Sequence, residues 1–284
     1  MIIIKKILDI TSKENLIESI AEICDCNKDS ILNYIKTASV FTHTPKEEIK
    51  LEPFFKALGL KFQNKSELYD LIKFDMITVS HITTRKSTPN NTDIYPVTEC
   101  LLRKNDLTTC LNNYGLIFKK NGNEVITFFN NKKIEWDNFE HPFSNRISKR
   151  LKFKGEYIDN CINGFLINEK IWEDSDVEHI KTCPEILSDI CEVLDIDYIK
   201  EIWEGEAVPY VVSFLVNIND IILDSYSKYR TSKSKVYIIY KIILYYLVQS
   251  NNNLWYPKFD NEIIRLKDNL SVKKENIIDF FEIE

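Results

Sequence analysis

Two short segments of the chain carry side chains whose types and spacing could do chemistry. The first is His81-Ile-Thr83, inside the β-branched run 76–84. Because side chains alternate along a strand, an imidazole and a hydroxyl two residues apart point to the same side. A helical pattern that ends on Gly115 follows, and a polar ring before such a helix is typical of a ligand cleft. A core histidine with a threonine that satisfies backbone groups is the alternative.

The second segment is Glu204-Gly-Glu206, directly before the clearest strand pattern of the chain, at 210–216. We expect a turn here, which would place Glu206 at the entrance of the strand, where the rim of a cleft usually lies. A carboxylate in that position can stabilise a developing oxocarbenium ion or accept a proton from an incoming nucleophile. Two exposed acids in a turn are the alternative.

Basic residues are densest between residues 146 and 154, where five lysines and arginines gather. The full chain has 37 Lys and Arg against 43 Asp and Glu, a formal charge of −6. This balance opposes a broad grip on a phosphate backbone. We therefore expect the run 146–154 to be a solvated face, with local nucleic-acid recognition as the alternative.

Metal-binding and hydrolase motifs are weak or absent from the sequence. His179 and Cys183 are four residues apart and would share a helix face, but zinc normally needs three or four converging ligands. We therefore expect no metal site. The chain has no Gly-rich phosphate loop, Gly-x-Ser-x-Gly elbow or His-Glu-x-x-His, which disfavours P-loop hydrolysis, α/β-hydrolase chemistry and zincin proteolysis.

The composition is that of a folded protein, and we expect it to be cytoplasmic. The 284 residues are 44% hydrophobic and 12% aromatic, enough to bury a core. Seven cysteines, an odd number without a CxxC pair, are typical of reduced thiols. The longest apolar stretch, 236–248, is interrupted by Lys241 and falls short of the roughly 18 to 20 residues that cross a bilayer, so we expect no membrane contact.

The elements that position these residues follow from apolar spacing and turn signals. Apolar steps of three and four predict helices within 12–75, with Ser12 as an N-cap, a second start near 27–30 and Gly59 as a left-handed C′ residue. Asn121-Gly122 is expected to form a type I′ hairpin turn. Further helices are expected at 106–113, 184–195 and 235–249, and strands at 76–84, 116–120, 124–129, 210–216 and within 270–283.

The pattern of the sequence changes near residue 75. Helical spacing dominates before this point, whereas short β-branched runs separated by Asn and Gly follow it. We therefore expect an α+β protein with a helical N-terminal region, 1–75, and an α+β body, 76–284.

The order of these features resembles the ADP-ribosyltransferase fold. A strand with His81-x-Thr83, a short helix that ends in Asn113-Tyr-Gly-Leu116, hairpins, and Glu204-x-Glu206 before a long strand are similar to that family, and the likeness covers about 76–284. It implies a split β-sandwich body that binds NAD as its substrate and breaks the bond between nicotinamide and ribose.

The resemblance also implies roles for individual residues. Glu206 would stabilise the positive charge that builds as nicotinamide leaves, and His81 would hydrogen-bond the ribose on the nicotinamide side. An aromatic ring on the second strand would stack on nicotinamide. The residues implied to contact NAD are Thr83, Arg85, Phe128, Phe129 and Glu204, with Tyr157 as a second candidate for the stacking ring.

The leading functional hypothesis is therefore an NAD-using enzyme similar to the ADP-ribosyltransferases. It would transfer ADP-ribose to a protein or nucleic-acid acceptor, or hydrolyse NAD, as a toxin or defence effector does. The alternative is a non-catalytic interaction module whose N-terminal helices bind a partner protein. The sequence Thr127-Phe128-Phe129 favours this alternative, because family members with a first-strand histidine usually carry a second-strand tyrosine.

Overall fold

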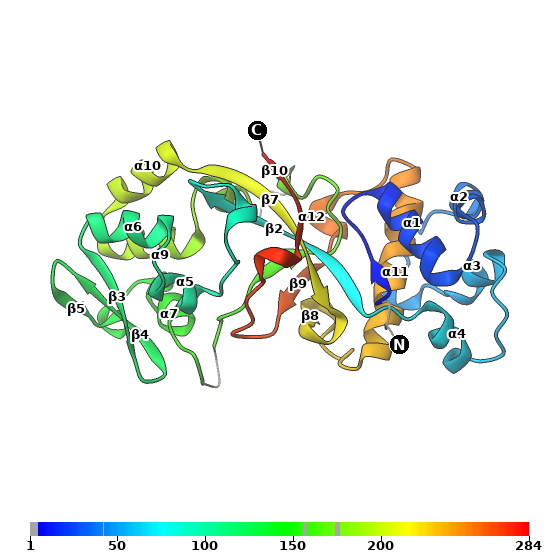
Figure 1. The fold of residues 1–284 in the computed structure, drawn as a ribbon, viewed down its shortest axis with the longest axis horizontal. Helices are drawn as coiled ribbons and strands as arrows, with labels where there is room; N and C mark the ends of the chain where they lie inside the picture. Colours follow the sequence, from blue (N-terminus) through cyan, green and yellow to red (C-terminus); the bar gives the residue numbers. More distant parts are fainter. Residues whose placement is uncertain (1–4, 42, 156–157, 174–176, 284) are drawn as a thin grey trace. The chain divides into compact units, whose positions relative to one another are not determined.

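The structure is a computed structural model that describes residues 5–41, 43–155, 158–173 and 177–283, and Figure 1 shows its helices and strands. It is a mixed α+β protein, as the sequence predicts. The helices are α1 (Lys13–Cys24), α2 (Lys28–Thr37), α3 (Glu52–Ala57), α4 (Lys65–Ile72), α5 (Val97–Leu102), α6 (Asp106–Asn113), α7 (Pro142–Arg150), α8 (Glu178–Thr182), α9 (Glu185–Leu194), α10 (Asp197–Glu206), α11 (Ser232–Asn251) and α12 (Pro257–Asp260). The strands are β1 (Ile7–Leu8), β2 (Met76–Arg85), β3 (Leu116–Asn121), β4 (Glu124–Phe129), β5 (Lys132–Ile134), β6 (Asn163–Phe165), β7 (Val208–Asn217), β8 (Ile221–Leu223), β9 (Ile263–Leu266) and β10 (Ile277–Glu282).

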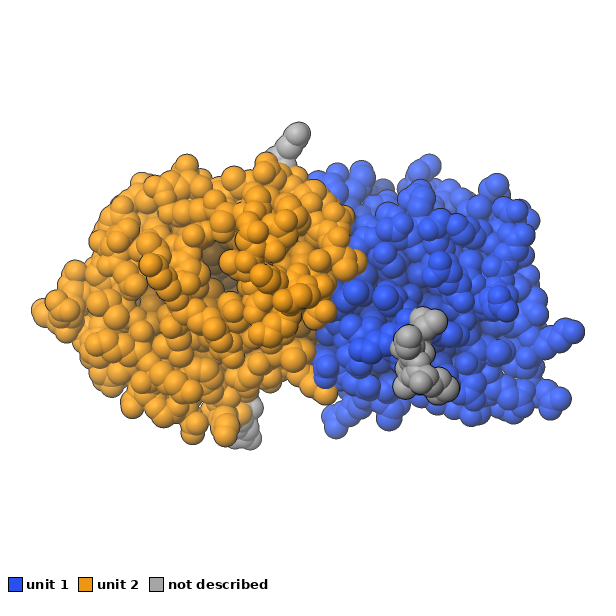
Figure 2. Space-filling view, in the orientation of Figure 1, with its two compact units in different colours: residues 1–80, 165–173, 215–264 blue, residues 81–164, 174–214, 265–284 orange. Residues whose placement is uncertain are grey.

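The chain folds into two compact units, coloured blue and orange in Figure 2. Unit 1 consists of residues 1–80, 165–173 and 215–264, and unit 2 consists of the remaining residues. This division differs from the expected boundary at residue 75. The N-terminal helices share unit 1 with segments that are distant in sequence, above all with α11.

The helices of unit 1 begin and end where local chemistry predicts. The Ser12 hydroxyl accepts a hydrogen bond from the backbone N–H of Asn15 at the start of α1, and the Asn27 side chain accepts one from Asp29 at the start of α2. Gly59, with a φ of +90°, follows the end of α3. These three predictions are confirmed.

Helix α11 supplies the apolar partner that the N-terminal helices need. It is buried around most of its circumference, as expected for a helix at the centre of a unit. The Tyr240 ring packs edge-on against Phe55, with ring centroids 5.2 Å apart. Its hydroxyl donates to the backbone carbonyl of Ile72, 3.1 Å away. The N-terminal helices are therefore held by a helix that begins more than 150 residues later in the sequence.

Two sheets order the strands. The larger sheet has the strand order β10-β7-β2-β6-β9-β8, with β1 paired parallel to β2. The other sheet has the order β3-β4-β5. In unit 2, β7 and β10 are antiparallel, with Val212 opposite Phe280. β2 thus lies between β7 and β6, with hydrogen-bonded neighbours on both sides.

The apolar core of unit 2 is built from the β3-β4 hairpin and from helices α6, α9 and α10. Fully buried side chains include Leu111 of α6, Leu116 of β3, Ile190 of α9 and Trp203 of α10, whose exposed fraction is 1%. This core fixes the direction of α10, and with it the position of Glu206.

The residues Glu204 to Glu206 form the last turn of helix α10, so the predicted turn is wrong at this point. Ile199 and Trp203 are four residues apart and both buried, which keeps the backbone helical past them. Gly205 disfavours a helix by about 1 kcal/mol relative to alanine. The burial of Trp203 outweighs that cost.

The hairpin turn also differs from its prediction. Asn121 lies opposite Glu124 in the strand register, so the two loop residues are Gly122 and Asn123. Gly122 has a φ of +58°, whereas Asn123 does not have a positive φ. A positive φ at the first loop residue alone is typical of a type II′ turn, and the type I′ prediction is therefore wrong.

Among the described residues, none of the helices combines the length and the apolar composition that a bilayer crossing requires.

Candidate functional site

Strand β2 presents two different faces. His81, Thr83 and Arg85 are half-buried, whereas Ile82 and Thr84 between them are buried. Because side chains alternate along a strand, His81, Thr83 and Arg85 point to the same side, which we call the odd face of β2. Ile82 and Thr84 point to the opposite side, which we call the even face.

The imidazole of His81 is oriented by the neighbouring strand β6. Its Nδ1 lies 2.6 Å from the backbone carbonyl oxygen of Asn163. Because a carbonyl only accepts, Nδ1 carries the proton and Nε2 of the neutral ring is an acceptor. Burial lowers the pKa of His81 to about 4; the carbonyl of Asn163 opposes this shift and the positive charge of Arg85 adds to it. At neutral pH the ring is uncharged and could accept a hydrogen bond from a ligand hydroxyl.

Arg85 lies at the end of the same face. Its Nη1 donates to the hydroxyl of Thr92, 2.7 Å away. Burial lowers the pKa of Arg85, and the nearby Cys100 and Asp106 partly offset this, but a guanidinium remains charged in proteins. The odd face therefore combines a neutral acceptor, a hydroxyl and a cation within five residues.

Glu206 belongs to the even face. The indole Nε1 of Trp203 donates to the Thr84 hydroxyl, 3.0 Å away, in a buried contact. This bond puts α10 on the even face of β2. The carboxylate of Glu206 forms an ion pair with Lys86, directly after β2, and its side chain is 57% exposed. The structure therefore does not bring Glu206 together with His81.

Lys86 is a charged residue of this region that the sequence analysis missed. Its ammonium lies 5.3 Å from the centre of the Trp203 ring, within the range of a cation–π contact. Burial by itself lowers the pKa of Lys86, but the hydrogen bond and charge of Glu206, together with Cys110 and Asp106, outweigh burial and raise it. Nothing in its spacing from Glu206, 120 residues apart, could have shown this pair.

Glu204 does not share a surface with Glu206. Two residues apart on a helix, side chains point in different directions. The charge of Glu204 acts instead on Cys183, whose pKa is raised mainly by burial and further by this carboxylate. The two acids that the resemblance treats as one motif thus act on different neighbours.

The aromatic residues expected to stack on a ligand lie in the smaller sheet. Phe128 and Phe129 are adjacent residues of β4 and so point to opposite sides. Phe129 packs against the core of unit 2, and the Phe128 ring lies under the ammonium of Lys119, 5.1 Å away. β4 pairs only with β3 and β5 among the described strands, so neither ring lies on a neighbour strand of His81. Tyr157 lies outside the described residues.

The two arginines of the basic run 146–154 are paired with acids. Arg146 donates through Nε to Asp189, 2.7 Å away. Arg150 pairs with Glu185 at 2.7 Å and with Asp159 at 3.0 Å. The side chain of Asp189 is only 2% exposed, so these arginines hold α7 to α9. This arrangement favours a structural role for Arg146 and Arg150 over contact with a nucleic acid.

Within the described part of the chain, no three His, Cys, Asp or Glu residues gather as metal ligands do. Cys183 is fully buried. His179 lies 3.9 Å from the carboxylate of Glu185.

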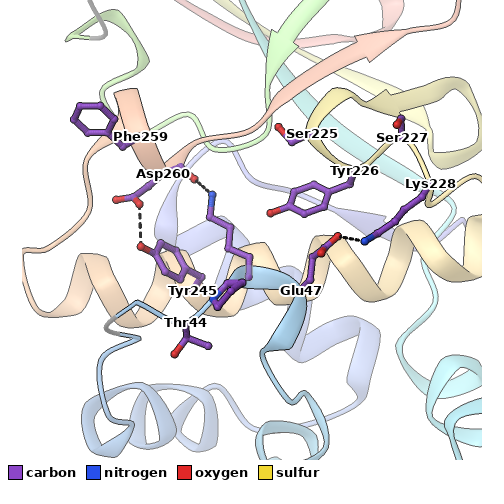
Figure 3. A pocket seen from close by; sticks show the side chains of 11 residues that line it. Thr44, Glu47, Ser225, Tyr226, Ser227, Lys228, Tyr245, Phe259 and Asp260 are labelled. Atoms are coloured by element: carbon purple, nitrogen blue, oxygen red, sulfur yellow. Dashed lines mark hydrogen bonds and ion pairs between the residues drawn. The ribbon is translucent and has the colours of Figure 1, made fainter.

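A surface pocket of about 540 Å³ lies entirely within unit 1, and Figure 3 shows its lining. It is formed by residues 44–47, residues 225–228, Tyr245, Phe259 and Asp260. None of the residues singled out from the sequence lines it.

No protein-family model, curated protein or solved structure matches the chain.

Proposed function

We propose that the protein is an NAD-using enzyme similar to the ADP-ribosyltransferases, and that the odd face of β2 contacts the dinucleotide. In this proposal unit 2 corresponds to the split β-sandwich of that family. The acceptor of ADP-ribose is a protein, a nucleic acid or water, and the biological role is that of a toxin or defence effector.

The observation that carries the proposal is the state of His81. A neutral imidazole with Nδ1 tied to the Asn163 carbonyl offers Nε2 as an oriented acceptor. A ribose hydroxyl is the group that such an acceptor suits. Thr83 adds a hydroxyl on the same face, and the Arg85 guanidinium adds a charge suited to a pyrophosphate oxygen.

The proposed role of Glu206 is to stabilise the oxocarbenium ion that forms as the bond between ribose C1′ and nicotinamide nitrogen breaks. The bonding electrons leave with nicotinamide, and the acceptor nucleophile then attacks C1′. In the structure Glu206 is paired with Lys86 on the even side of β2. The proposed role therefore requires Glu206 to leave Lys86 and to reach the ribose that is bound at the odd face.

The test is nicotinamide release from NAD by the purified protein, with NAD affinity measured by calorimetry. We expect His81→Ala to weaken NAD binding roughly tenfold or more, because the variant loses about one neutral hydrogen bond between the protein and NAD. We expect Glu206→Gln to lower turnover by roughly 100-fold or more with little change in affinity.

Matched controls come from the same unit. His179 is an exposed histidine, and Glu201 is an exposed acid of α10, so His179→Ala and Glu201→Gln should leave both measurements unchanged. Equal rates for wild type and Glu206→Gln would remove the role of that carboxylate. No binding and no turnover of NAD would overturn the whole proposal.

The second candidate is a non-catalytic interaction module. The separation of Glu206 from His81 across β2 favours it, because an active site needs its groups in one place. In this candidate the N-terminal helices bind a partner protein. Tight NAD binding with no partner captured would count against it, and turnover that depends on Glu206 would exclude it.

A further inference from the structure

The small sheet β3-β4-β5, labelled in Figure 1, belongs to unit 2 and covers the core with one face only. Phe118 and Thr127 lie opposite each other in the register and are buried. In the next opposite pair, Lys119 is exposed and Ile126 is half-buried. This alternation is typical of an antiparallel sheet with one face toward solvent. We call the solvent side the outer face of the small sheet.

The outer face carries an aromatic ring between basic side chains. Phe128 is half-buried on the central strand β4 and lies opposite Lys133 of β5. The ammonium of Lys119, on the other neighbouring strand, lies 5.1 Å from the centre of the Phe128 ring. A ring on a central strand with lysines on both sides offers a stacking surface for a base and cations for the adjacent phosphates.

The segment that follows α7 adds further lysines at the tip of the β3-β4 hairpin. Lys152 forms a β-bridge with Glu124, and so extends the outer face beyond β4. The ammonium of Lys120 lies 4.8 Å from the centre of the Phe153 ring. Glu124 is the only acid in the three strands. The basic residues of the outer face and its rim are therefore drawn from β3, from β5 and from residues 149–154.

Most of these positive charges are not neutralised within the described part of the chain. The lysines are Lys119, Lys120, Lys133, Lys149, Lys152 and Lys154. Among the described residues, only Lys133 takes part in an ion pair, with Glu135 at 2.7 Å. The full chain has a formal charge of −6, so this surface differs in sign from the protein as a whole. Its charge is complementary to a polyanion.

We propose that the outer face of the small sheet binds a single-stranded nucleic acid, with a base stacked on Phe128 and phosphates at the surrounding lysines. A single strand can turn the faces of its bases toward a protein ring, whereas a duplex keeps them stacked inside. The inference does not rest on the proposed use of NAD, because neither β2 nor α10 contributes to this sheet.

The test is fluorescence anisotropy with labelled strands of about 20 nucleotides, one of deoxythymidine and one of uridine, between about 50 and 200 mM salt. Binding of either strand supports the proposal, and the tighter one identifies the preferred sugar. Each phosphate contact contributes about −0.7 to the slope of log affinity against log salt. Contacts from roughly three to five lysines therefore predict a slope of about −2 to −3.5.

Two variants separate the phosphate contacts from base stacking. Lys119→Glu combined with Lys152→Glu is expected to weaken binding at least about tenfold and to flatten the slope by about 1.4. Phe128→Ala is expected to weaken binding about fivefold or more with an unchanged slope, because stacking does not release counterions.

Matched controls keep the charge or the ring. Lys36→Glu combined with Lys61→Glu makes the same change of charge at exposed positions of unit 1, and should cost less than about twofold, since salt screens distant charges. Phe128→Tyr retains an aromatic ring and should retain most of the affinity. Thermal unfolding followed by circular dichroism checks that each variant keeps the fold.

A wild type that binds neither strand at about 50 mM salt would overturn the proposal. Equal losses in the two lysine double variants would assign binding to net charge alone and would overturn it as well. Duplex DNA that binds as tightly as the strands would remove the role of Phe128. Binding to vesicles of phosphatidylserine and phosphatidylcholine, with no binding to either strand, would show that the polyanion is a membrane surface instead.

Discussion

The properties of His81 are set by its surroundings. In water a histidine ring gains and loses its proton near pH 6.5. In the folded protein, burial makes the charged ring costly, and the Asn163 carbonyl, which favours the protonated form, only partly opposes this. The result is a neutral acceptor over the whole physiological range, which is the form needed to bind a hydroxyl. To act as a general acid at neutral pH, His81 would need a raised pKa instead of a lowered one.

The lowered pKa of His81 predicts a pH-dependent loss of stability. The unfolded chain protonates this ring near pH 6.5, whereas the folded chain does so at about 4. Between these values the unfolded state binds more protons, so stability falls as the pH falls from about 6.5 to about 4. The loss is on the order of 1 to 3 kcal/mol, given that one pKa unit corresponds to about 1.4 kcal/mol.

Urea unfolding of wild type and His81→Gln at pH 7, pH 5 and pH 4 measures this term. The wild type should lose more free energy of unfolding than the variant between about pH 7 and pH 4. His179→Gln, at an exposed position, should follow the wild type. Parallel pH profiles for wild type and His81→Gln would contradict the prediction.

At the level of elements, the contact between α10 and β2 decides the geometry of the candidate site. Trp203 is buried in the core of unit 2 and donates its indole N–H to Thr84. Because Thr84 is on the even face, helix α10 packs on that side of β2. Glu206, which belongs to α10, therefore lies on the even side and not on the odd face.

A double-mutant cycle tests whether this contact couples the two elements. We expect Trp203→Phe to lower the free energy of unfolding by about 1 to 3 kcal/mol, through the lost hydrogen bond and a small cavity. Thr84→Val removes the same bond from the other side. The two changes should show a coupling energy of about 1 kcal/mol in urea unfolding.

A second buried contact between a tryptophan and a threonine provides the control for this cycle. Trp136 donates to the hydroxyl of Thr127, 3.2 Å away, in another buried contact. Trp203→Phe combined with Thr127→Val should therefore be additive, as expected for separate contacts. Additive effects for Trp203 and Thr84 as well would show that the hydrogen bond does not tie α10 to β2.

At the level of the whole molecule, the two units interleave along the chain. Unit 1 needs the N-terminal helices and α11 together, since Phe55 and Phe74 both pack on Tyr240. The helical region 1–75 has amphipathic helices, but the surface that they bury against comes from the second half of the chain. Residues 1–75, which look like a separate region in the sequence, therefore contribute only part of the core of unit 1, and α11 contributes another part.

This interleaving predicts the behaviour of residues 1–75 as an isolated fragment. Without α11, the apolar faces of its helices lose their partner, and short helices are marginal by themselves in water. We expect the fragment to show no cooperative thermal transition by circular dichroism, whereas the full chain unfolds cooperatively. A sharp transition of the fragment with near-ultraviolet signal would show that it folds alone.

Most of the local structure follows from the amino-acid sequence. Apolar spacing predicted α6 at its observed bounds and placed α1, α2, α9, α11, β2 and β7 to within a few residues. The caps at Ser12 and Asn27 follow from side chains that bond the nearest backbone groups. These features depend on interactions within a few residues, and so the sequence carries them directly.

The contacts between side chains of distant segments depend on how the whole chain packs. Alternation along the strand predicted that His81 and Thr83 share a face, and the structure adds Arg85 to it. Glu206 meets Lys86 because Trp203, three residues before it, is buried and binds Thr84. The partner of the N-terminal helices was likewise settled by the packing of Tyr240. Such contacts join residues more than a hundred positions apart, and they are chosen by the burial of whole helix faces. No spacing rule within one segment contains that information.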